Sequence, residues 1–506
     1  MAYNDPKREI NYDITEVHGD SDIISNEKVE TKKKSWRNKL FGESIKYKTK
    51  EEKTFVRKLD FWLISWTFIA YLIKSIDQAN VSNAYVSGMQ EELNFKGHQY
   101  NLLESFFKIG YSIALVPSQI MLNKIQPAYW LSSCELIWGI LTALCAVPKN
   151  NPNGLYAIRF FMGIFESSSW PGIIIILGNY YNKEELALRI GLFQTSSYVG
   201  AMFTGFMQSS IHTTLNGKQG LSGWRWMFII NGLMTIVVAV SGFFIVPDTP
   251  ENGGAKYWMN DDDRRIALER MERAGRKTKR NMTLKTFIST FTDWKTWSFV
   301  LIFAVKGWTI APNYFNLYLK SLKNSDGSKT YTISQLNTIP IGGNALQIIS
   351  LILFTKLASI FGHSLEFIIF QGLLAFFANV SLAVWPSSRS YQHACFFIMQ
   401  FTEAIGPFQL TYMAEVFSDS PEKRAICTGI TVVFVYANVA WQTIYLWPAN
   451  EAPRYKYAYK VSSAYIAISI IGTIFYYYYV YKPAVERNEN LQRKREEEEN
   501  LGTLTD

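Results

Sequence analysis

The sequence predicts an all-α polytopic membrane protein whose twelve transmembrane helices form two six-helix halves. Of its 506 residues 48% are hydrophobic, and the charged residues concentrate in the two tails and one central stretch. Between them lie apolar runs close to the roughly 20 residues that a helix needs to cross a bilayer. A soluble protein of this length would spread its charges along amphipathic helices instead. A weak internal repeat, offset by about 235 residues, relates one half to the other.

The polar residues 1–56 predict a disordered cytosolic tail. The basic run from Lys32 to Leu40 either contacts anionic lipid headgroups or simply fixes the topology. The net charge of +9 comes mostly from loops beside membrane segments, so a positive-inside bias explains it better than nucleic-acid binding. The four cysteines lie in or beside apolar runs without a regular spacing, which argues against disulfides and against a zinc site.

Twelve apolar runs predict the spans, six in an N-terminal bundle (57–247) and six in a C-terminal bundle (293–481), with a cytosolic tail over 482–506. An even number of spans places both termini on one side of the membrane. Because Lys and Arg gather in the tails and the central loop, we expect that side to be the cytosol. The runs lie near 59–79, 101–122, 130–147, 155–178, 190–211, 226–246, 293–317, 336–357, 365–385, 391–414, 425–447 and 459–480.

The central loop, 248–292, contains a charged segment that predicts a short surface helix capped by Asn260 or Asp261. Ile266, Leu268 and other apolar residues of this segment do not form one clean stripe. We therefore expect a linker helix that packs loosely under the bundle, and we assign it no catalytic role.

The fourth span carries two charges inside an apolar run, and the prediction of function starts from them. Arg159, Gly163 and Glu166 fall at i, i+4 and i+7, so they share one helix face. A charge at membrane depth costs at least about 2.5–3.5 kcal/mol, and such residues usually face a protein interior or a wet cavity on a transport pathway.

The internal repeat bears on whether this arginine is structural. The turn from Lys183 to Gly191 resembles the stretch from Asp419 to Gly429, and the run around Arg159 resembles the run that begins at Cys395. The second half therefore has a cysteine where the first has Arg159. Helix packing common to both halves does not require the arginine, which favours a functional role.

Several motifs resemble the major facilitator superfamily and, within it, the fungal allantoate permease family of anion:cation symporters. The similarity is greatest to the branch that imports vitamins, including the pantothenate and biotin permeases. The run from Phe165 to Gly172 is nearer the pantothenate pattern, whereas the run from Lys74 to Asp77 is nearer the biotin pattern. The motifs are Ser75–Leu93, Ala157–Ser167, Gly223–Gly232, Val246–Glu251, Leu317–Leu322 and Glu451–Tyr455.

The chain departs from this resemblance in two places. Many relatives have Asp-Arg at the outer end of span one, where this chain has Asp77-Gln78. The Gly-rich loop with an Asp-Arg-Arg signature between spans two and three is reduced to Asn123–Trp130. The gating salt bridge that relatives form at this loop is therefore not expected here.

Glu166 is the candidate proton carrier, because a buried carboxyl group can take up and release a proton as the site alternates between the two sides of the membrane. At 1.5 Å per residue it lies about 10 Å deeper than Arg159. Asp77 and Arg159 are expected at similar depths on neighbouring helices, so a pair between them is predicted. Asp77 is either a second proton-coupling residue or part of a static clasp, and Glu166 could instead pair permanently with Arg159.

An anionic substrate needs fixed positive charge, and Arg159 and Lys306 are the leading candidates for binding its carboxylate. Lys74 and Lys108 are further candidates, although all three lysines could instead extend toward an interface. Polar and aromatic side chains could complete the site. These include Trp170 and Gln347 as substrate-binding candidates, with Gln194, Trp308, Asn344, Glu403, Trp441 and Gln442.

The resemblance implies a secondary transporter that imports a small organic anion with protons across the plasma membrane, pantothenate first. Biotin, nicotinate or another monocarboxylate is the alternative substrate, and a nutrient sensor on the same scaffold is the alternative class. A drug-extruding antiporter is disfavoured by the cations within the membrane. The sequence has no Walker-type glycine loop, so neither an enzyme nor an ATP-driven pump is expected. The expected partners are the anion, the proton and the lipid bilayer, without a cofactor, and the protein is expected to be a monomer.

Overall fold

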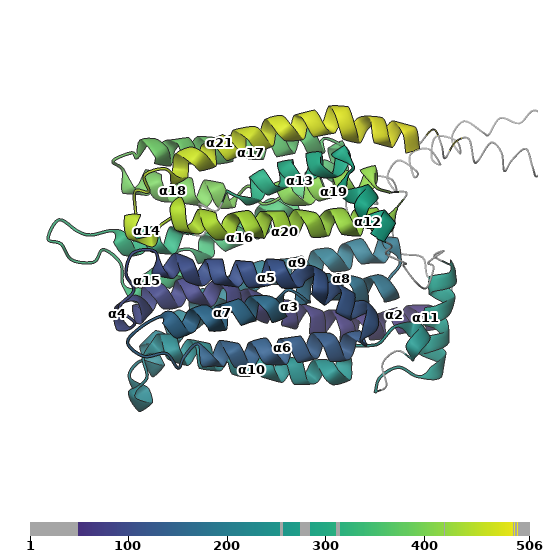
Figure 1. Ribbon diagram of the computed structural model, residues 1–506, viewed down its shortest axis with the longest axis horizontal. Coiled ribbons are helices and arrows are strands. Elements are labelled where there is room, and N and C mark those ends of the chain that lie inside the picture. The colour runs from purple at the N-terminus through teal and green to yellow at the C-terminus, as the bar shows by residue number, and fades with distance from the viewer. Residues whose placement is uncertain are drawn as a thin grey trace, which may run out of the picture.

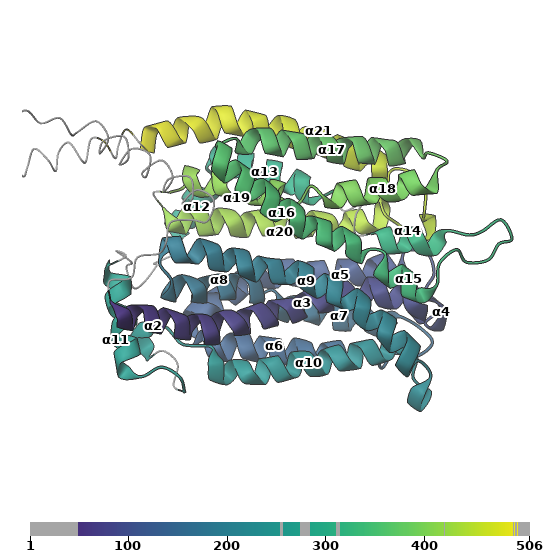
Figure 2. The same cartoon turned by 180° about the vertical axis from the view of Figure 1, so that it is seen from behind.

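The computed structural model describes residues 49–253, 257–273, 284–309, 314–418, 420–488, 490 and 493. Apart from one isolated β-bridge, this part of the chain is built of helices and the loops between them. Figures 1 and 2 show two groups of long helices side by side, purple to blue-teal for the first half and green to yellow for the second. The predicted all-α fold of two helical halves is therefore confirmed. The basic run Lys32–Leu40 lies outside the described residues.

The first half contains the six predicted N-terminal spans. Span one is a continuous helical stretch, and span four is divided into two helices. The elements are α2 (Lys50–Leu59), η1 (Asp60–Ile64), α3 (Ser65–Ala84), η2 (Tyr85–Met89), α4 (Gln90–Glu92), α5 (Gln99–Lys124), α6 (Pro127–Leu144), α7 (Asn153–Glu166), α8 (Ser169–Tyr180), α9 (Lys183–Leu215), η3 (Lys218–Gly220), α10 (Gly223–Ile245) and η4 (Pro250–Asn252).

The second half follows two helices of the central region, α11 (Asp261–Arg273) and α12 (Leu284–Phe291). Three of its spans are divided into two helices each. The elements are α13 (Trp294–Gly307), α14 (Phe315–Ser321), α15 (Ile333–Thr338), α16 (Ile341–Phe361), α17 (Ser364–Val384), α18 (Arg389–Gln400), α19 (Ile405–Val416), α20 (Pro421–Tyr445), η6 (Ala449–Glu451), α21 (Ala458–Tyr476) and η7 (Tyr477–Tyr481).

Within the described residues, seven helices are long and apolar enough to cross a membrane by length and composition. The five other predicted spans correspond to α5, α6 and α9, which contain charged or polar side chains, and to α13–α14 and α18–α19, which the structure divides. Because polar residues within a membrane are costly, spans with polar residues or helix breaks are candidates for a functional site.

The internal repeat is visible in the helix boundaries of spans four and ten. The step from Asn153, where α7 begins, to Arg389, where α18 begins, is 236 residues, and so is the step from Tyr180 to Val416, where α8 and α19 end. Each span is broken near its middle, after Glu166 in the first half and after Gln400 in the second. The sequence repeat therefore corresponds to a shared broken-helix geometry.

The two ends of the bundle differ in how the halves meet. We call the end where α2 begins and η7 finishes the terminal end, and the opposite end, with α14 and α15, the α14 end (Figure 1). At the α14 end one apolar cluster is shared by both halves, including Phe107 and Trp224 of the first half and Phe315 and Trp447 of the second. Neither of two further clusters crosses between the halves. One lies around Phe55 and includes Trp258 and Ala267 of the central region, and the other lies around Phe299 in the second half.

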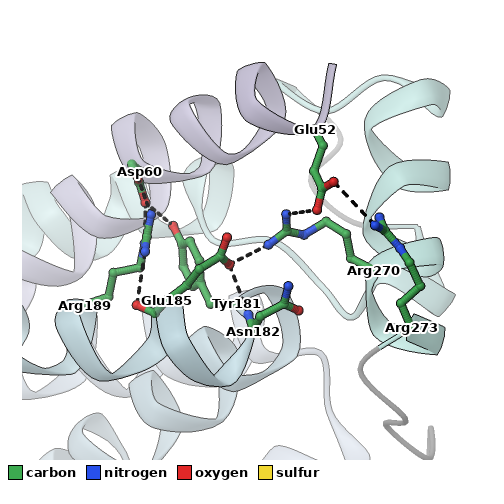
Figure 3. Close-up of polar contacts among 8 residues, drawn as sticks. All are labelled: Glu52, Asp60, Tyr181, Asn182, Glu185, Arg189, Arg270 and Arg273. Atoms are coloured by element: carbon green, nitrogen blue, oxygen red, sulfur yellow. Dashed lines mark hydrogen bonds and ion pairs between the residues drawn. The ribbon is translucent and has the colours of Figure 1, made fainter. Parts of the chain in front are cut away.

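The central region is held more firmly than the sequence suggested. Asn260 accepts a hydrogen bond from the backbone N–H of Asp263 at 2.8 Å, so the predicted cap is confirmed. The expectation of a loosely packed α11 is wrong, because Arg270 is buried and bridges α2 to α9 through Glu52 (2.6 Å) and Glu185 (2.5 Å) (Figure 3). Helix α2 also begins at Lys50, inside the stretch predicted to be a disordered tail.

Two glycines bring α5 and α7 unusually close together. A Cβ atom added at Gly163 would lie 2.1 Å from the backbone oxygen of Phe107, and one added at Gly110 would lie 2.1 Å from the backbone oxygen of Phe160. Backbone atoms cannot yield as a flexible side chain can, so both positions require glycine. This contact fixes α5 beside the charged face of α7.

Candidate functional site

Arg159 and Glu166 are both buried on α7, as their spacing predicted, but they have different partners. Arg159 approaches Glu104 of α5, with Nη2 3.9 Å from Oε1. Its guanidinium also lies 4.4 Å from the ring centroid of Phe107. The alternative of a permanent Arg159–Glu166 pair is not what the structure has, because each charge meets a residue of another helix.

Glu166 is held by two side chains of α3. Gln78 donates a hydrogen bond from Nε2 to Oε1 at 2.6 Å, and Lys74 Nζ lies 3.8 Å from the same oxygen. The other carboxylate oxygen, Oε2, is buried and has no hydrogen-bond partner in the described part of the chain. A carboxyl group with a free oxygen and one long ion pair can accept a proton without breaking a strong bond.

Lys74 lies among aromatic rings rather than extending to an interface. Its side chain is 4% exposed, and Nζ is 5.0 Å from the ring centroid of Tyr71 and 5.7 Å from that of Tyr111. Tyr111 in turn stacks on Tyr436 of the second half, with ring centroids 4.5 Å apart. Lys74 is therefore an interior cation beside the contact between the halves, and aromatic faces stabilise it there.

Glu104 is the site residue that sequence reasoning missed. It lies between two predicted substrate-binding cations, Arg159 and Lys108, and Lys108 Nζ is 3.3 Å from its Oε2. The available signal was a pair of opposite charges four residues apart inside an apolar run. Opposite charges at this spacing face each other on one side of a helix.

Asp77 makes its hydrogen bonds to other helices of the first half and not to this cluster. Trp138 of α6 donates to Oδ2 at 3.0 Å, Thr235 of α10 donates to the same oxygen at 3.3 Å, and Asn231 donates to Oδ1. The predicted pair with Arg159 is wrong, because Asp77 faces α6 and α10 whereas Arg159 faces α5. The static clasp between Asp77 and Arg159 is therefore not formed, while a part of Asp77 in proton coupling stays a prediction.

The remaining predicted binding residues are more dispersed. Lys306 is half-buried on α13 with Nζ beside Gly406 of α19, and the described residues offer its ammonium group no hydrogen bond or ion pair. Gln347 is half-buried on α16. Trp170 packs on the apolar cluster around Phe55, toward the terminal end. The structure thus brings Lys74, Lys108 and Arg159 together in the first half, and their part in binding stays a prediction.

Other polar candidates connect or line the two halves. Tyr198 of α9 donates a hydrogen bond to Glu403, at the break of span ten, with a length of 2.9 Å. Trp308 packs against rings of the second half, and its buried Nε1 has no partner in the described residues. Trp441 is 45% exposed, so its ring lies on the outer surface of the bundle. The alternative of a lipid-facing aromatic fits Trp441 better than a place in the site.

Direct bonds between the halves gather at the α14 end. Asn101 of α5 donates to the backbone oxygen of Trp447 at 2.7 Å, and Asn316 of α14 donates to Asn83 at 2.6 Å. Lys320 forms an ion pair of 3.1 Å with an exposed glutamate near the end of span one. Together with the shared apolar cluster, these bonds close the α14 end over the charged residues.

The sequence profile of the Major Facilitator Superfamily matches residues 67–442. The chain is 31% identical over 456 residues to the MFS transporter PfmaC of Pestalotiopsis fici, covering 89% of this chain and 84% of the relative. It is 28% identical over 412 residues to the pantothenate transporter liz1 of Schizosaccharomyces pombe, covering 80% and 78%. It is 34% identical over 303 residues to the pantothenate transporter FEN2 of Saccharomyces cerevisiae, covering 58% and 57%.

Solved structures share the fold at low sequence identity. The proton:xylose symporter XylE from E. coli, bound to 6-bromo-6-deoxy-D-glucose, superposes with a TM-score of 0.63 at 13% identity. The superposition covers 83% of this chain and 95% of that structure. The likeness supports the twelve-helix architecture of two halves.

Proposed function

This chain belongs to the major facilitator superfamily of membrane transporters, and we propose that it imports a small organic monocarboxylate, pantothenate first, together with protons. The observation that carries this proposal is Glu166, a fully buried carboxyl group whose second oxygen has no hydrogen-bond partner in the described part of the chain. Lys74 and Gln78 hold its first oxygen only from α3. Protonation of Glu166 releases Lys74 from its ion pair, which couples proton uptake to the positive charge available for an anion.

The arrangement of the halves supports transport by alternating access. Bonds between the halves gather at the α14 end, and the apolar clusters separate by half toward the terminal end. We assign the terminal end to the cytosol, because Lys and Arg concentrate in the segments on that side. In this state the site is closed to the outside, and a substrate leaves toward the cytosol.

The substrate class follows from the charges around the site. Lys74, Lys108 and Arg159 outnumber the carboxylates Glu104 and Glu166 by one positive charge. Protonation of Glu166 adds one positive charge to this excess, and the single carboxylate of a bound anion balances the proton taken up. Two relatives, from two yeasts, are named as pantothenate transporters, which supports pantothenate as the first substrate to test.

Biotin is the second candidate, because Lys74 and the residues after it resemble the biotin pattern. Lys74 is also part of the charged site, where it contacts Glu166. We place the protein in the plasma membrane, where the membrane potential opposes anion entry by about 2.3 kcal/mol per charge per 100 mV. Coupling to protons offsets this cost. A nutrient sensor has no need of such coupling, and uptake measurements separate the two classes.

Uptake of labelled pantothenate in cells that lack their own permease tests the proposal. We expect saturable uptake that rises as the external pH falls and collapses when a protonophore is added. Unlabelled biotin and nicotinate in excess then rank the alternative substrates. Uptake that is unchanged by the protonophore would rule out proton coupling, and no uptake of any of the three acids would rule out the vitamin assignment.

A further inference from the structure

Glu104 connects two cations that come from different helices. Its Oε1 lies 3.9 Å from Nη2 of Arg159 on α7, and its Oε2 lies 3.3 Å from Nζ of Lys108 on α5. Both contacts are longer than the roughly 2.7–2.9 Å of a strong charge-assisted hydrogen bond. The Nε of Arg159 is buried without a hydrogen-bond partner among the described residues. The arginine therefore still has a donor to offer to another acceptor.

The position of Glu104 on α5 places it on the face that packs toward the second half. Residues 104, 108 and 111 recur at helical spacing and share one face. Tyr111 on that face stacks on Tyr436 of the second half. The opposite face of α5 carries Ile109 and Ile113, which are 41% and 61% exposed, as expected for a lipid-facing surface. The side chain of Glu104, on the inner face, is 22% exposed.

We propose that Glu104 occupies the anion site of Arg159 and Lys108 when no substrate is bound, and that the carboxylate of the substrate takes its place. The inference rests on the proposed transport of an organic anion and assigns the binding group within it. A carboxylate on the substrate has the same two oxygens as Glu104 and gains the free Nε donor of Arg159 as well. Both ion pairs are long, and Glu104 and Lys108 are partly exposed, so exchanging Glu104 for another carboxylate costs little.

This exchange explains why a carboxylate lies within a site for anions. Without a counter-ion, the buried Arg159 and the half-buried Lys108 would repel each other, and the arginine would carry a desolvation cost. Glu104 removes that cost in the empty carrier. It also sets a threshold for binding, because only a ligand with its own carboxylate can replace it. An uncharged analogue of the same shape leaves Glu104 in place.

The test is ligand binding by the purified full-length protein, measured as a shift in melting temperature with pantothenate and with panthenol, its uncharged alcohol analogue. We expect Glu104→Gln to bind pantothenate roughly five- to tenfold more tightly, the size expected from releasing two partly exposed ion pairs. Panthenol binding should stay unchanged. Weaker pantothenate binding by Glu104→Gln, or an equal gain for panthenol, would overturn the proposal.

Glu104→Asp is the second variant, because it keeps the charge but withdraws it from both cations by one methylene group. We expect a smaller gain in pantothenate affinity, and no gain in either variant would also overturn the proposal. If the wild-type protein binds another acid of a monocarboxylate panel but not pantothenate, the pantothenate assignment fails. The same comparison of variants, with that acid and its amide, then tests Glu104 separately.

Discussion

Two sets of ion pairs differ in geometry, one at the terminal end that includes α11 of the central region and one inside the first half. At the terminal end Arg270 meets Glu52 and Glu185 at 2.6 and 2.5 Å, and Arg189 meets Asp60 at 2.6 Å (Figure 3). In the middle of the bundle the pairs of Lys74, Lys108 and Arg159 are 3.3–3.9 Å long. Short pairs fix three chain segments in one arrangement, whereas long pairs leave room for an ion to exchange.

The difference also appears in the number of donors that each arginine uses. Arg189 donates from Nε and Nη2 to the two oxygens of Asp60 and from Nη1 to a backbone oxygen. Arg159 instead has its Nε free of any partner in the described residues. Arg270 also has a buried Nε without a partner in the described residues, so a free donor alone does not distinguish the two sets, whereas the short ion pairs of Arg270, a structural clamp, and the long one of Arg159 do.

Breaking the clamp should have the largest effect on stability. Arg270→Met takes the buried cation that Glu52 and Glu185 share away from both carboxylates, and we expect the free energy of unfolding to fall by about 3–5 kcal/mol. Thermal unfolding of the purified protein measures this loss. Arg265→Met is the matched control, because its side chain is 63% exposed and its pair with Asp262 lies at the surface. Equal melting temperatures for the two variants would contradict the comparison.

Breaking the loose pair should affect transport more than stability. Glu166→Gln removes the proposed proton carrier, and we expect proton-driven uptake to fall about 10- to 100-fold, equivalent to about 1.4–2.8 kcal/mol. The remaining uptake should no longer depend on external pH. Glu135→Gln is the control, since Glu135 is another buried carboxyl of this half with an oxygen that has no partner in the described residues. Loss of pH dependence in the control but not in Glu166→Gln would contradict the assignment.

Asp77 tests whether a well-bonded carboxylate behaves as a clamp or as a coupling residue. In Asp77→Asn, the new amide cannot accept every hydrogen bond that Trp138, Asn231 and Thr235 donate. We expect a loss of stability of about 1–3 kcal/mol. The protein that folds should keep the pH dependence of its uptake. If Asp77→Asn keeps its stability but its uptake no longer depends on pH, Asp77 is instead assigned to proton coupling.

The smallest expected effect concerns the bond between the halves at Tyr198. Tyr198→Phe removes one hydrogen bond to Glu403, worth about 0.5–1.5 kcal/mol, and should shift the balance between conformations by about two- to tenfold. Labelling of a cysteine introduced at Ser209, which meets Ser334 across the halves at 2.5 Å, measures opening of the α14 end. Tyr465→Phe is the control, because the hydroxyl of Tyr465 bonds Gln442 within the second half. If the cysteine is labelled equally in Tyr198→Phe and Tyr465→Phe, Tyr198 has no role in closing the α14 end.

The fold could be predicted from the sequence because apolar length and charge placement determine it directly. The repeat around Arg159 and Cys395 likewise predicted a relation between the halves that the breaks in spans four and ten confirm. Helical spacing also placed Arg159 and Glu166 on one buried face. These properties depend on one helix at a time, so they can be derived from its own residues.

The partners of those charges could not be derived in the same way. Depth along the membrane suggested that Asp77 meets Arg159, but depth does not say which way a side chain points around its helix. The rotation of α3 turns Asp77 toward α6 and α10 and brings Lys74 to Glu166. Glu104 escaped notice because its role depends on α5 lying against α7, which is a property of the packing.

The contact of Gly110 and Gly163 sets the spacing on which the charged site depends. Each glycine lies against the backbone of the facing helix. The distance between α5 and α7 is therefore fixed, and with it the distance between Glu104 and Arg159. Any side chain at Gly163 would increase the distance between α5 and α7. It would move the carboxylate of Glu104 away from the guanidinium of Arg159 without changing a single charge. Selectivity for an acid in this carrier would then be tuned by a residue that has no side chain at all.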